Sequence, residues 1–529
     1  MRATPFTTLG LLALTALLAC GVPEQASREI GETWDASHTV ALQDGIYLRM
    51  LRHNALVRVT PDGSATPIDL GEGQISKMLP SPDGTSLVGF VARTTCDAPQ
   101  DELDKMSLIS DCPFEDRVAQ TTLELIRDGA VAASLDVPAT YNALAWSDTG
   151  AKAIAYLDFE QLDANTNLGV MDLTSVMVVD MASGAATPVS VGFAADRILF
   201  APSREVGQDS TSAVVLSQSS VAVIDLSGDT PERVVTFPLT LDPDQRVNPV
   251  GVELTPDGQY ALISVQGRDD LYVLDLVNHS VNMVSLSYLP TAMAVDQRVD
   301  RTVFVYQSQS VADILEHDLF ELQSVPLDEP MADILQGDGF ALLYNNNNAY
   351  YHDLYRLDLE TGDLLEYRLQ NPILSLQMAP AEDFAIALTR AESGYGSGIE
   401  GYYDMSPGME ILDLRDTERA RSTPYLLEQP AAGLAFSATE TALYALILQQ
   451  NTDYLYQLDL YTGQATEVDL SAPPLDLGTL ADGTFYITHK APYGLISFYD
   501  AATGAVTEVR NFALDGFFDD DLLTLPEVE

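Results

Sequence analysis

Basic residues are scarce in this chain of 529 residues. It has 26 Lys+Arg against 78 Asp+Glu, which gives a formal net charge of −52 and a surface that repels the phosphate backbone of nucleic acids. We therefore expect no nucleic-acid partner. The hydrophobic fraction is 46%, which is ample for a large core and excludes wholesale disorder.

Long hydrophobic runs and local catalytic motifs are missing as well. No segment beyond the N-terminal signal has 18 uninterrupted apolar residues, so we expect the rest of the protein to be soluble. The six histidines are scattered, and the sequence has no HExxH spacing, no GxSxG elbow and no Walker loop. These absences favour a binding protein over an enzyme, although residues far apart in sequence can still meet at one site.

Residues 1–19 are predicted to be a cleavable signal. The basic Arg2 precedes an apolar stretch, Leu9–Leu18, that is far shorter than the ~20 residues needed to span a bilayer. The stretch ends in Leu17-Leu18-Ala19-Cys20, which resembles the lipobox of bacterial lipoproteins. The resemblance implies cleavage before Cys20 and lipidation of its new N-terminus. The alternative is an ordinary secretory signal.

Several acyl chains on Cys20 would give a stable membrane anchor, because one chain alone binds only marginally. Gly21 follows the cysteine, where inner-membrane lipoproteins of the enterobacterial pattern carry Asp. The resemblance therefore implies an outer-membrane lipoprotein of the cell envelope. Residues 20–37 are polar and irregular, as suits a lipidated tether.

Cys96 and Cys112 remain as a pair in an oxidising compartment, where a disulfide is the expected state. They bracket an acidic insertion, and cross-linking a loop of this size contributes ~3 kcal/mol in the chain-entropy model. A metal site is the weaker alternative, because neither His nor a third Cys lies nearby.

A short motif recurs along the chain: an apolar strand that ends in Asp and is followed by a turn. The acids are 40 to 55 residues apart from the second copy onward, and nine copies place them at Asp128, Asp180, Asp225, Asp275, Asp318, Asp358, Asp413, Asp459 and Asp500. In the clearest copies the turn closes on Gly, as in Leu357–Gly362. The Asp side chain accepts hydrogen bonds from the N–H groups ahead of it, and Gly takes a positive φ without steric cost.

A second turn, of the Pro-Asp-Gly type, falls about twenty residues upstream in several units, as at Thr255–Gly258. Each unit therefore predicts four antiparallel strands in ~45 residues, which is the period of a β-propeller blade. The unit Val250–Leu286 resembles the YVTN and Pro-Asp-Gly repeats of bacterial propellers, including the TolB group. The WD40 signature itself is missing.

The resemblance extends over residues 38–515 and implies an all-β fold of four-stranded blades. Ten candidate units indicate one large ring of 8–10 blades, with irregular units or two rings as alternatives. Residues 516–529 are predicted to be an acidic tail or a ring-closing segment. Such repeats serve binders, enzymes and scaffolds alike, so the fold does not decide the function.

Insertions at 94–120, 158–174 and 391–409 interrupt the repeat, and loops on a rigid scaffold are where binding usually resides. Within the second, Asp163, Asn165 and Asn167 have the oxygen spacing of a calcium loop, although Leu168 and Thr174 depart from that pattern. Calcium is thus a possible ligand beside the alternative of an incidental polar loop, and no cofactor is required.

Two further segments are rich in side chains that could contact a ligand. Tyr402 and Tyr403, in the third insertion, could contact a ligand, although most tyrosines of the chain suit packing between blades. The four-Asn run 345–348 is predicted to be a solvated loop between strands.

The acidity itself is typical of proteins adapted to high salt, with divalent-ion binding as the second interpretation. Taken together, the sequence favours a membrane-anchored, non-enzymatic propeller that recognises an envelope protein or glycan. The alternatives are an extracytoplasmic lyase or hydrolase with its site at the channel mouth, and a structural scaffold.

Overall fold

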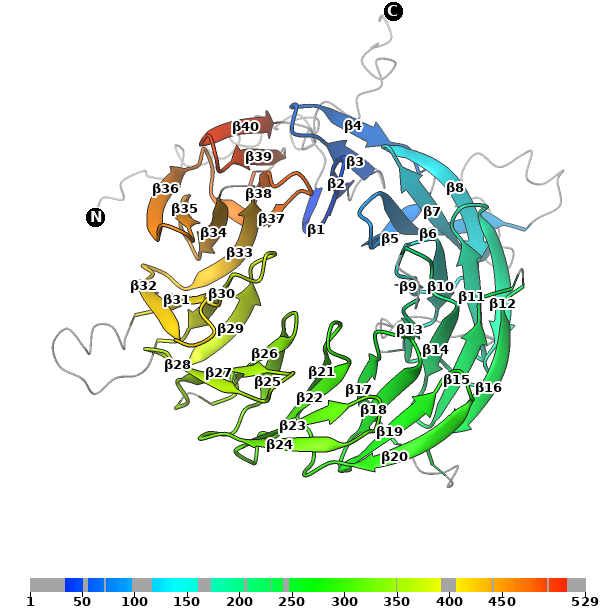
Figure 1. Cartoon of the computed structure of the whole chain (residues 1–529). Coiled ribbons are helices and arrows are strands. Elements are labelled where there is room, and N and C mark those ends of the chain that lie inside the picture. Colours follow the sequence, from blue (N-terminus) through cyan, green and yellow to red (C-terminus); the bar gives the residue numbers. More distant parts are fainter. Residues whose placement is uncertain are drawn as a thin grey trace, which may run out of the picture.

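The computed structural model describes residues 34–510 except 51–55, 71–72, 98–116, 160–172, 204–206, 229, 241–246, 349, 392–405, 440–441 and 492–493. Within these residues every element is a β-strand, and the forty strands form ten antiparallel four-stranded sheets. The sheets follow one another around an open centre as the ten blades of a single propeller (Figure 1). The all-β fold and the single large ring are confirmed, and the blade number is ten.

Each blade uses four consecutive strands, and the first strand of each lies nearest the central axis (Figure 1). The strands of the first five blades are: blade 1, β1 (Trp34–Leu42), β2 (Gly45–Met50), β3 (Leu56–Val59), β4 (Ala65–Ile68); blade 2, β5 (Gln74–Pro80), β6 (Ser86–Cys96), β7 (Arg117–Arg127), β8 (Ala130–Val137); blade 3, β9 (Ala143–Trp146), β10 (Lys152–Tyr156), β11 (Ser175–Asp180), β12 (Ala185–Ser190); blade 4, β13 (Arg197–Phe200), β14 (Ser212–Leu216), β15 (Ser220–Asp225), β16 (Glu232–Pro238); blade 5, β17 (Pro249–Leu254), β18 (Tyr260–Val265), β19 (Asp270–Asp275), β20 (Ser280–Ser285).

The second half of the ring repeats this order without interruption. Its strands are: blade 6, β21 (Ala292–Val295), β22 (Arg301–Val305), β23 (Val311–Glu316), β24 (Leu322–Pro326); blade 7, β25 (Asp333–Gln336), β26 (Phe340–Tyr344), β27 (Asp353–Asp358), β28 (Leu364–Arg368); blade 8, β29 (Ile373–Met378), β30 (Phe384–Thr389), β31 (Gly408–Asp413), β32 (Arg421–Leu426); blade 9, β33 (Ala431–Ala438), β34 (Leu443–Gln449), β35 (Tyr454–Asp459), β36 (Gln464–Asp469); blade 10, β37 (Pro474–Thr479), β38 (Phe485–His489), β39 (Leu495–Asp500), β40 (Ala505–Arg510).

Position within the blade explains the composition of each strand. Second strands are covered on both faces, so they are nearly continuous apolar runs, such as the fully buried FALLY of β26. Outer strands are exposed at most positions, as in the SVNMVS of β20, and they carry more polar residues. This gradient from apolar to polar places the core between blades rather than within one blade.

Buried hydrophobic side chains divide into ten clusters, one at each interface between neighbouring blades. The cluster that closes the ring packs Ile46 and Leu48 of blade 1 against Ile496 and Phe498 of blade 10. No described sheet combines strands from the two ends of the chain. Side-chain packing, rather than a shared sheet, therefore joins the first blade to the last.

The repeated turns have the hydrogen bonds expected from the sequence. Asp180 accepts hydrogen bonds through Oδ1 from the backbone N–H groups of Ala182 and Ser183, at 3.1 and 2.7 Å, and Gly184 follows with φ of 70°. In the Pro-Asp-Gly turns the Asp plays the same part, and Asp83 accepts from the N–H of Thr85 at 3.0 Å. These local bonds fix the hairpins independently of the neighbouring blades.

Candidate functional site

The strand order gives the ring two different faces. Connections from first to second strand and from third to fourth strand return on one face, and nearly all are the short Asp-containing turns; we call this the turn face. Connections from second to third strand, and from each blade to the next, return on the other face, which we call the insertion face.

All three predicted insertions join the second strand of a blade to its third. Residues 97–116 connect β6 to β7, residues 157–174 connect β10 to β11, and residues 390–407 connect β30 to β31. Because these connections have the same place in blades 2, 3 and 8, the three insertions leave the scaffold on one face. The insertion face is thus the part of the ring where the sequence departs most from its repeat.

Most of the residues singled out from the sequence lie outside the described residues. This holds for Cys20, Cys112, the calcium-spaced Asp163, Asn165 and Asn167, and the tyrosine pair Tyr402 and Tyr403. Cys96, at the end of β6, is a disulfide cysteine. The assignment of Cys112 as its partner stays a prediction, as do the calcium and tyrosine sites.

The four-Asn run lies between β26 and β27, as expected for a loop, but it is not solvated throughout. Asn345 is 2% exposed and donates through Nδ2 to the carbonyl of Pro330 at 2.9 Å. Its Oδ1 accepts hydrogen bonds from the N–H groups of Asn347 and Asn348, both at 3.1 Å. Asn345 therefore anchors the loop to the preceding connection between blades, and the interpretation of the whole run as solvated was wrong.

A basic side chain lies at the base of each insertion, although the chain has few of them. In blade 2, Arg93 donates through Nη2 to Glu124 Oε1 and to the carbonyl of Leu70, both at 2.7 Å. At the next interface, the partly buried Lys77 approaches the carbonyl of Asn142 at 3.5 Å, and burial lowers its pKa while Asp158 opposes that shift.

Arg390 is the corresponding side chain in blade 8, directly before the third insertion. Its Nη2 donates to the carbonyl of Asn346 in blade 7, and its buried Nε has no hydrogen-bond partner among the described residues. A guanidinium with an unused N–H can donate to a further carboxylate, carbonyl or hydroxyl oxygen, because its five donors are fixed in a planar fork.

Two carboxylates stand near each other on the same face, between blades 6 and 7. Glu329 precedes β25 and Asp353 begins β27, and each has one buried oxygen without a partner in the described part of the chain. Burial raises the pKa of Glu329, and the negative charge of Asp353 raises it further. This arrangement favours a ligand that offers hydrogen-bond donors or positive charge.

A third acid of this face is built into the sheet. Glu410 in β31 is 3% exposed, and its Oε1 accepts a hydrogen bond from the backbone N–H of Gln370 in the connection from blade 7. Burial raises the pKa of Glu410, and the hydrogen bonds it accepts lower it again. Glu410 therefore links blade 8 to its neighbour at the base of the third insertion.

Sequence reasoning missed these residues, but a signal for some of them was present. Glu124, Asp313 and Glu410 occupy the same position, three residues before the end of the third strand, in an otherwise apolar run. Both Glu124 and Asp313 accept a hydrogen bond from the serine opposite on the outer strand, at 2.9 and 2.6 Å. Arg390 leaves no such signal, because its carbonyl partner Asn346 lies in a connection of another blade.

Two histidines form pairs with hydroxyl groups, yet neither pair can serve as a nucleophile with its base. His489 Nε2 lies 2.8 Å from Ser497 Oγ, and both side chains are 0% exposed. His317 Nε2 lies 2.8 Å from Thr302 Oγ1, and burial lowers the pKa of His317 to about 4. Since a substrate has no access to these buried atoms, we interpret both pairs as links between second and third strands.

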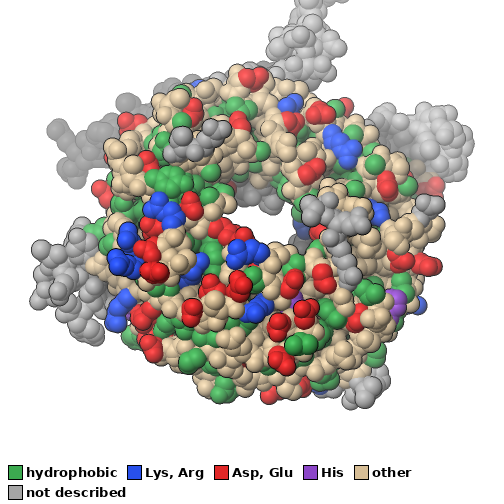
Figure 2. All heavy atoms as spheres, in the orientation of Figure 1, with side chains coloured by type: hydrophobic (Ala, Val, Ile, Leu, Met, Phe, Trp, Pro, Cys, Tyr) green, Lys and Arg blue, Asp and Glu red, His purple; other side chains and the backbone are tan. Residues whose placement is uncertain are grey.

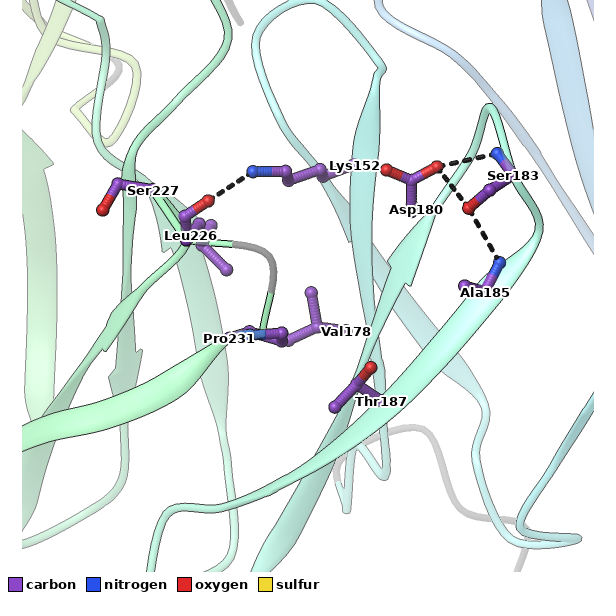
Figure 3. A pocket seen from close by; sticks show the side chains of 10 residues that line it. Lys152, Val178, Asp180, Ser183, Ala185, Thr187, Leu226, Ser227 and Pro231 are labelled. Atoms are coloured by element: carbon purple, nitrogen blue, oxygen red, sulfur yellow. Dashed lines mark hydrogen bonds between the residues drawn. The ribbon is translucent and has the colours of Figure 1, made fainter.

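The turn face holds a cavity of about 360 Å³ between blades 3 and 4. Lys152 of β10 reaches from blade 3 across the cavity and donates to the carbonyl of Leu226 in blade 4, while Asp180, beside Lys152 in β11, accepts from Ser183 (Figure 3). Arg301 makes the equivalent bond from blade 6 to the carbonyl of Leu359 in blade 7, and it also donates to the carbonyl of Glu360 at 2.8 Å. We therefore interpret Lys152 as a structural link between blades 3 and 4 and not as a group that binds a ligand.

The centre of the ring is open in the space-filling view, and acidic side chains are spread over the face shown (Figure 2). Near the first strands of blades 4 to 6 lies a cavity of about 210 Å³, lined by Arg197, Glu253 and Met293 among others. Burial raises the pKa of Glu253, and the charge of Arg197 opposes the shift. Within the described residues, no group of three or more His, Cys, Asp or Glu is arranged to hold a metal ion.

No protein-family model and no curated protein matches this chain. Solved structures similar to it include a eukaryotic initiation factor, at 11% identity over 74% of this chain and 88% of that chain, with a TM-score of 0.47. The hydrazine synthase of Kuenenia stuttgartiensis is 11% identical over 57% of this chain and 93% of that chain, with a TM-score of 0.32. The dihydro-heme d1 dehydrogenase NirN is 10% identical over 67% of this chain and 77% of that chain, with a TM-score of 0.37. No residue role is carried from them to this chain.

Proposed function

We propose that this chain is a binding module of the bacterial cell envelope, held at the outer membrane by lipid on Cys20, and that its insertion face contacts an envelope protein or glycan. The supporting observation is that all three insertions join second to third strands, so that they share one face of a rigid ring. Contact loops carried together on a rigid scaffold are the common arrangement in binding proteins.

The chemistry at the insertion bases supports a polar ligand. Arg390 carries a donor, whereas Glu329 and Asp353 carry acceptors; in each the atom without a partner among the described residues is buried, while the side chains of Arg390 and Glu329 are partly exposed. Hydroxyl-rich glycans and peptide backbones supply both donors and acceptors, so either can match this set. The proposed role is recognition, and no catalytic step is assigned to these groups.

A pair of photo-crosslinking positions tests which face binds. Tyr350 lies in the connection from β26 to β27 on the insertion face and is 84% exposed, whereas Leu319 lies in the turn from β23 to β24 on the turn face and is 67% exposed. Each is replaced in the full chain by p-benzoylphenylalanine and irradiated in intact cell envelopes. We expect adducts from position 350 and few from position 319, and equal yields or none from position 350 would overturn the proposal.

Membrane anchoring has its own test. In cells that process lipoproteins, the wild-type chain should incorporate labelled palmitate and sediment with the outer membrane. Cys20→Ser should remove the label and release the chain into the soluble fraction, because the lipid is the proposed attachment. A Cys20→Ser variant that still sediments with the membrane would contradict this part of the proposal. The described residues include no helix long and apolar enough to cross a bilayer.

A further inference from the structure

The outer strands of the ten blades are exposed edges, and nine of them carry a residue that discourages pairing with another strand. Charged residues and proline protect edges in natural sheets, because the first repel a partner and the second lacks an N–H donor. Only β20, with the sequence SVNMVS, has neither among the outer strands. The protecting residues of the other nine are Pro67, Asp136, Pro188, Glu232, Arg233, Pro238, Pro326, Glu366, Arg368, Arg421, Pro424, Glu467, Asp469, Glu508 and Arg510.

The backbone of β20 offers hydrogen-bonding groups on its outer side. The N–H of Leu286 donates to the carbonyl of Asp269, and donors alternate along an antiparallel strand. The N–H groups of Ser280, Asn282 and Val284 therefore face β19. Those of Val281 and Met283 point outward, where a further strand can bind them.

The side chains of the same residues form an apolar surface next to a cavity. Val281 and Met283 are 39% and 55% exposed, and they lie opposite Leu274 and Tyr272, which pack toward blade 4. On that side, between blades 4 and 5, is a cavity of about 440 Å³ lined in part by the exposed Val277. The cavity begins at the turn that precedes β20, where Val277 and His279 line it, so a strand added to β20 would place alternate side chains on Val281 and Met283 and one end beside the cavity.

The charge around the cavity favours one kind of binding partner for β20. Asp225, Asp257 and His279 line the cavity, and the hairpin from Asp275 to Leu286 contains no Lys or Arg. A second copy of the chain, with its net charge of −52, would therefore bring like charge and no cation to the cavity. A basic residue at one end of an incoming strand would complement the two carboxylates.

We propose that β20 binds, by strand addition, an extended segment of another protein with apolar residues at alternate positions and a Lys or Arg at one end. Backbone hydrogen bonds to Val281 and Met283 supply the affinity, the apolar side chains pack on the exposed side chains of these two residues, and the basic end lies beside the cavity between blades 4 and 5. This edge is separate from the insertion face, so it adds a second contact to the proposed binding function and does not depend on it.

The test uses a fluorescent peptide, Lys-Val-Thr-Val-Thr-Val-Gly, and anisotropy titrations with the full chain. Val281→Pro removes an outward N–H without breaking the ladder to β19. Val506→Pro is the matched control, because Val506 has the same place in β40 and a similar exposure of 42%. We expect Val281→Pro to weaken binding about ten-fold or more and Val506→Pro to leave it unchanged.

Two further measurements complete the design. Met283→Lys restores the missing protection and should also abolish binding, and replacing the peptide lysine by norleucine should weaken it at low salt. Sedimentation of the wild-type chain should show a monomer. Equal loss in both proline variants, no binding of the peptide, or a dimer that Met283→Lys dissociates would each overturn the proposal.

Discussion

On the turn face, Asp180 and Asp500 accept hydrogen bonds from the turns they begin, and these bonds lower the pKa of both carboxyl groups. On the insertion face, burial raises the pKa of Glu329 and Glu410. The same strongly acidic composition therefore has two physical roles. Asp180 and Asp500 stabilise the repeat as carboxylates, whereas Glu329 and Glu410 are kept in surroundings that disfavour their charge.

Not every acid of the turn face has a lowered pKa. Asp300, on the turn face, has a raised pKa because of burial and the nearby charges of Asp257, Asp318 and Asp296. These acids surround the buried His317. Where acids of three turns converge, the turn face resembles the insertion face, so the direction of the pKa shift follows from the local environment of each group.

The largest expected loss of stability comes from a substitution where two blades pack closely on the turn face. Gly258 has φ of 65°, and an added Cβ would lie 2.2 Å from the carbonyl oxygen of Pro202 in blade 4. Gly504 has φ of 71° with no atom within 4 Å of such a Cβ. We expect Gly504→Ala to cost ~1 kcal/mol through its left-handed backbone, and Gly258→Ala to cost more than ~2 kcal/mol. Urea denaturation measures both, and equal losses would mean that the blades can move apart here.

A smaller effect is expected from the turn acids. Asp180→Ala removes the acceptor for two backbone N–H groups and should destabilise the chain by about 1 kcal/mol at pH 7. Because the folded-state pKa is lowered, this contribution is present above the ordinary Asp pKa and is lost as the pH falls through the folded value. Asp180→Asn keeps an acceptor and should retain part of the stability, with less dependence on acid pH.

For Glu410 we expect the opposite dependence of stability on pH. Its folded-state pKa is raised, so its favourable contribution is present below the ordinary Glu pKa and is lost as the pH rises through the folded value. Glu410→Gln stays neutral at every pH. We therefore expect the variant to gain stability relative to wild type between pH 4 and pH 8, by about 1 kcal/mol or less. If Glu410→Gln instead lost stability over this pH range, the ionised Glu410 would be stabilising, as the acids of the turns are.

The smallest effect is expected at the exposed rim of the insertion face. Tyr350→Ser removes a side chain that is 84% exposed and should change the free energy of unfolding by less than about 0.5 kcal/mol. The same variant should weaken ligand capture if the insertion face binds. A large loss of stability would show instead that Tyr350 belongs to the packing of blade 7.

The sequence allowed the fold to be predicted in detail because the repeat is local. Asp358 and Gly362 lie within one hairpin, and their hydrogen bond depends on no distant residue. The number of blades could only be bounded, since it depends on Phe498 meeting Leu48 across the whole chain. Arg390 was missed for a related reason, because its carbonyl partner at Asn346 lies in another blade.

Asn345 shows the limit of reading a polar run by composition. Four successive Asn residues predict exposure, yet one of them is enclosed because the connection after β24 passes over it and supplies the Pro330 carbonyl. Such contacts depend on how successive blades are joined. They become visible only when the blades are placed in the ring.

Because side-chain packing alone joins blade 1 to blade 10, the ring should tolerate circular permutation of the chain. Blade 1 is made only from the N-terminal strands and blade 10 only from the C-terminal ones, so the break in the backbone coincides with an ordinary interface between blades. Joining the two ends and cutting between any other pair of blades would leave every sheet intact. A circularly permuted chain could therefore begin at any of the ten boundaries between blades, and the gain or loss of a whole blade would divide no sheet.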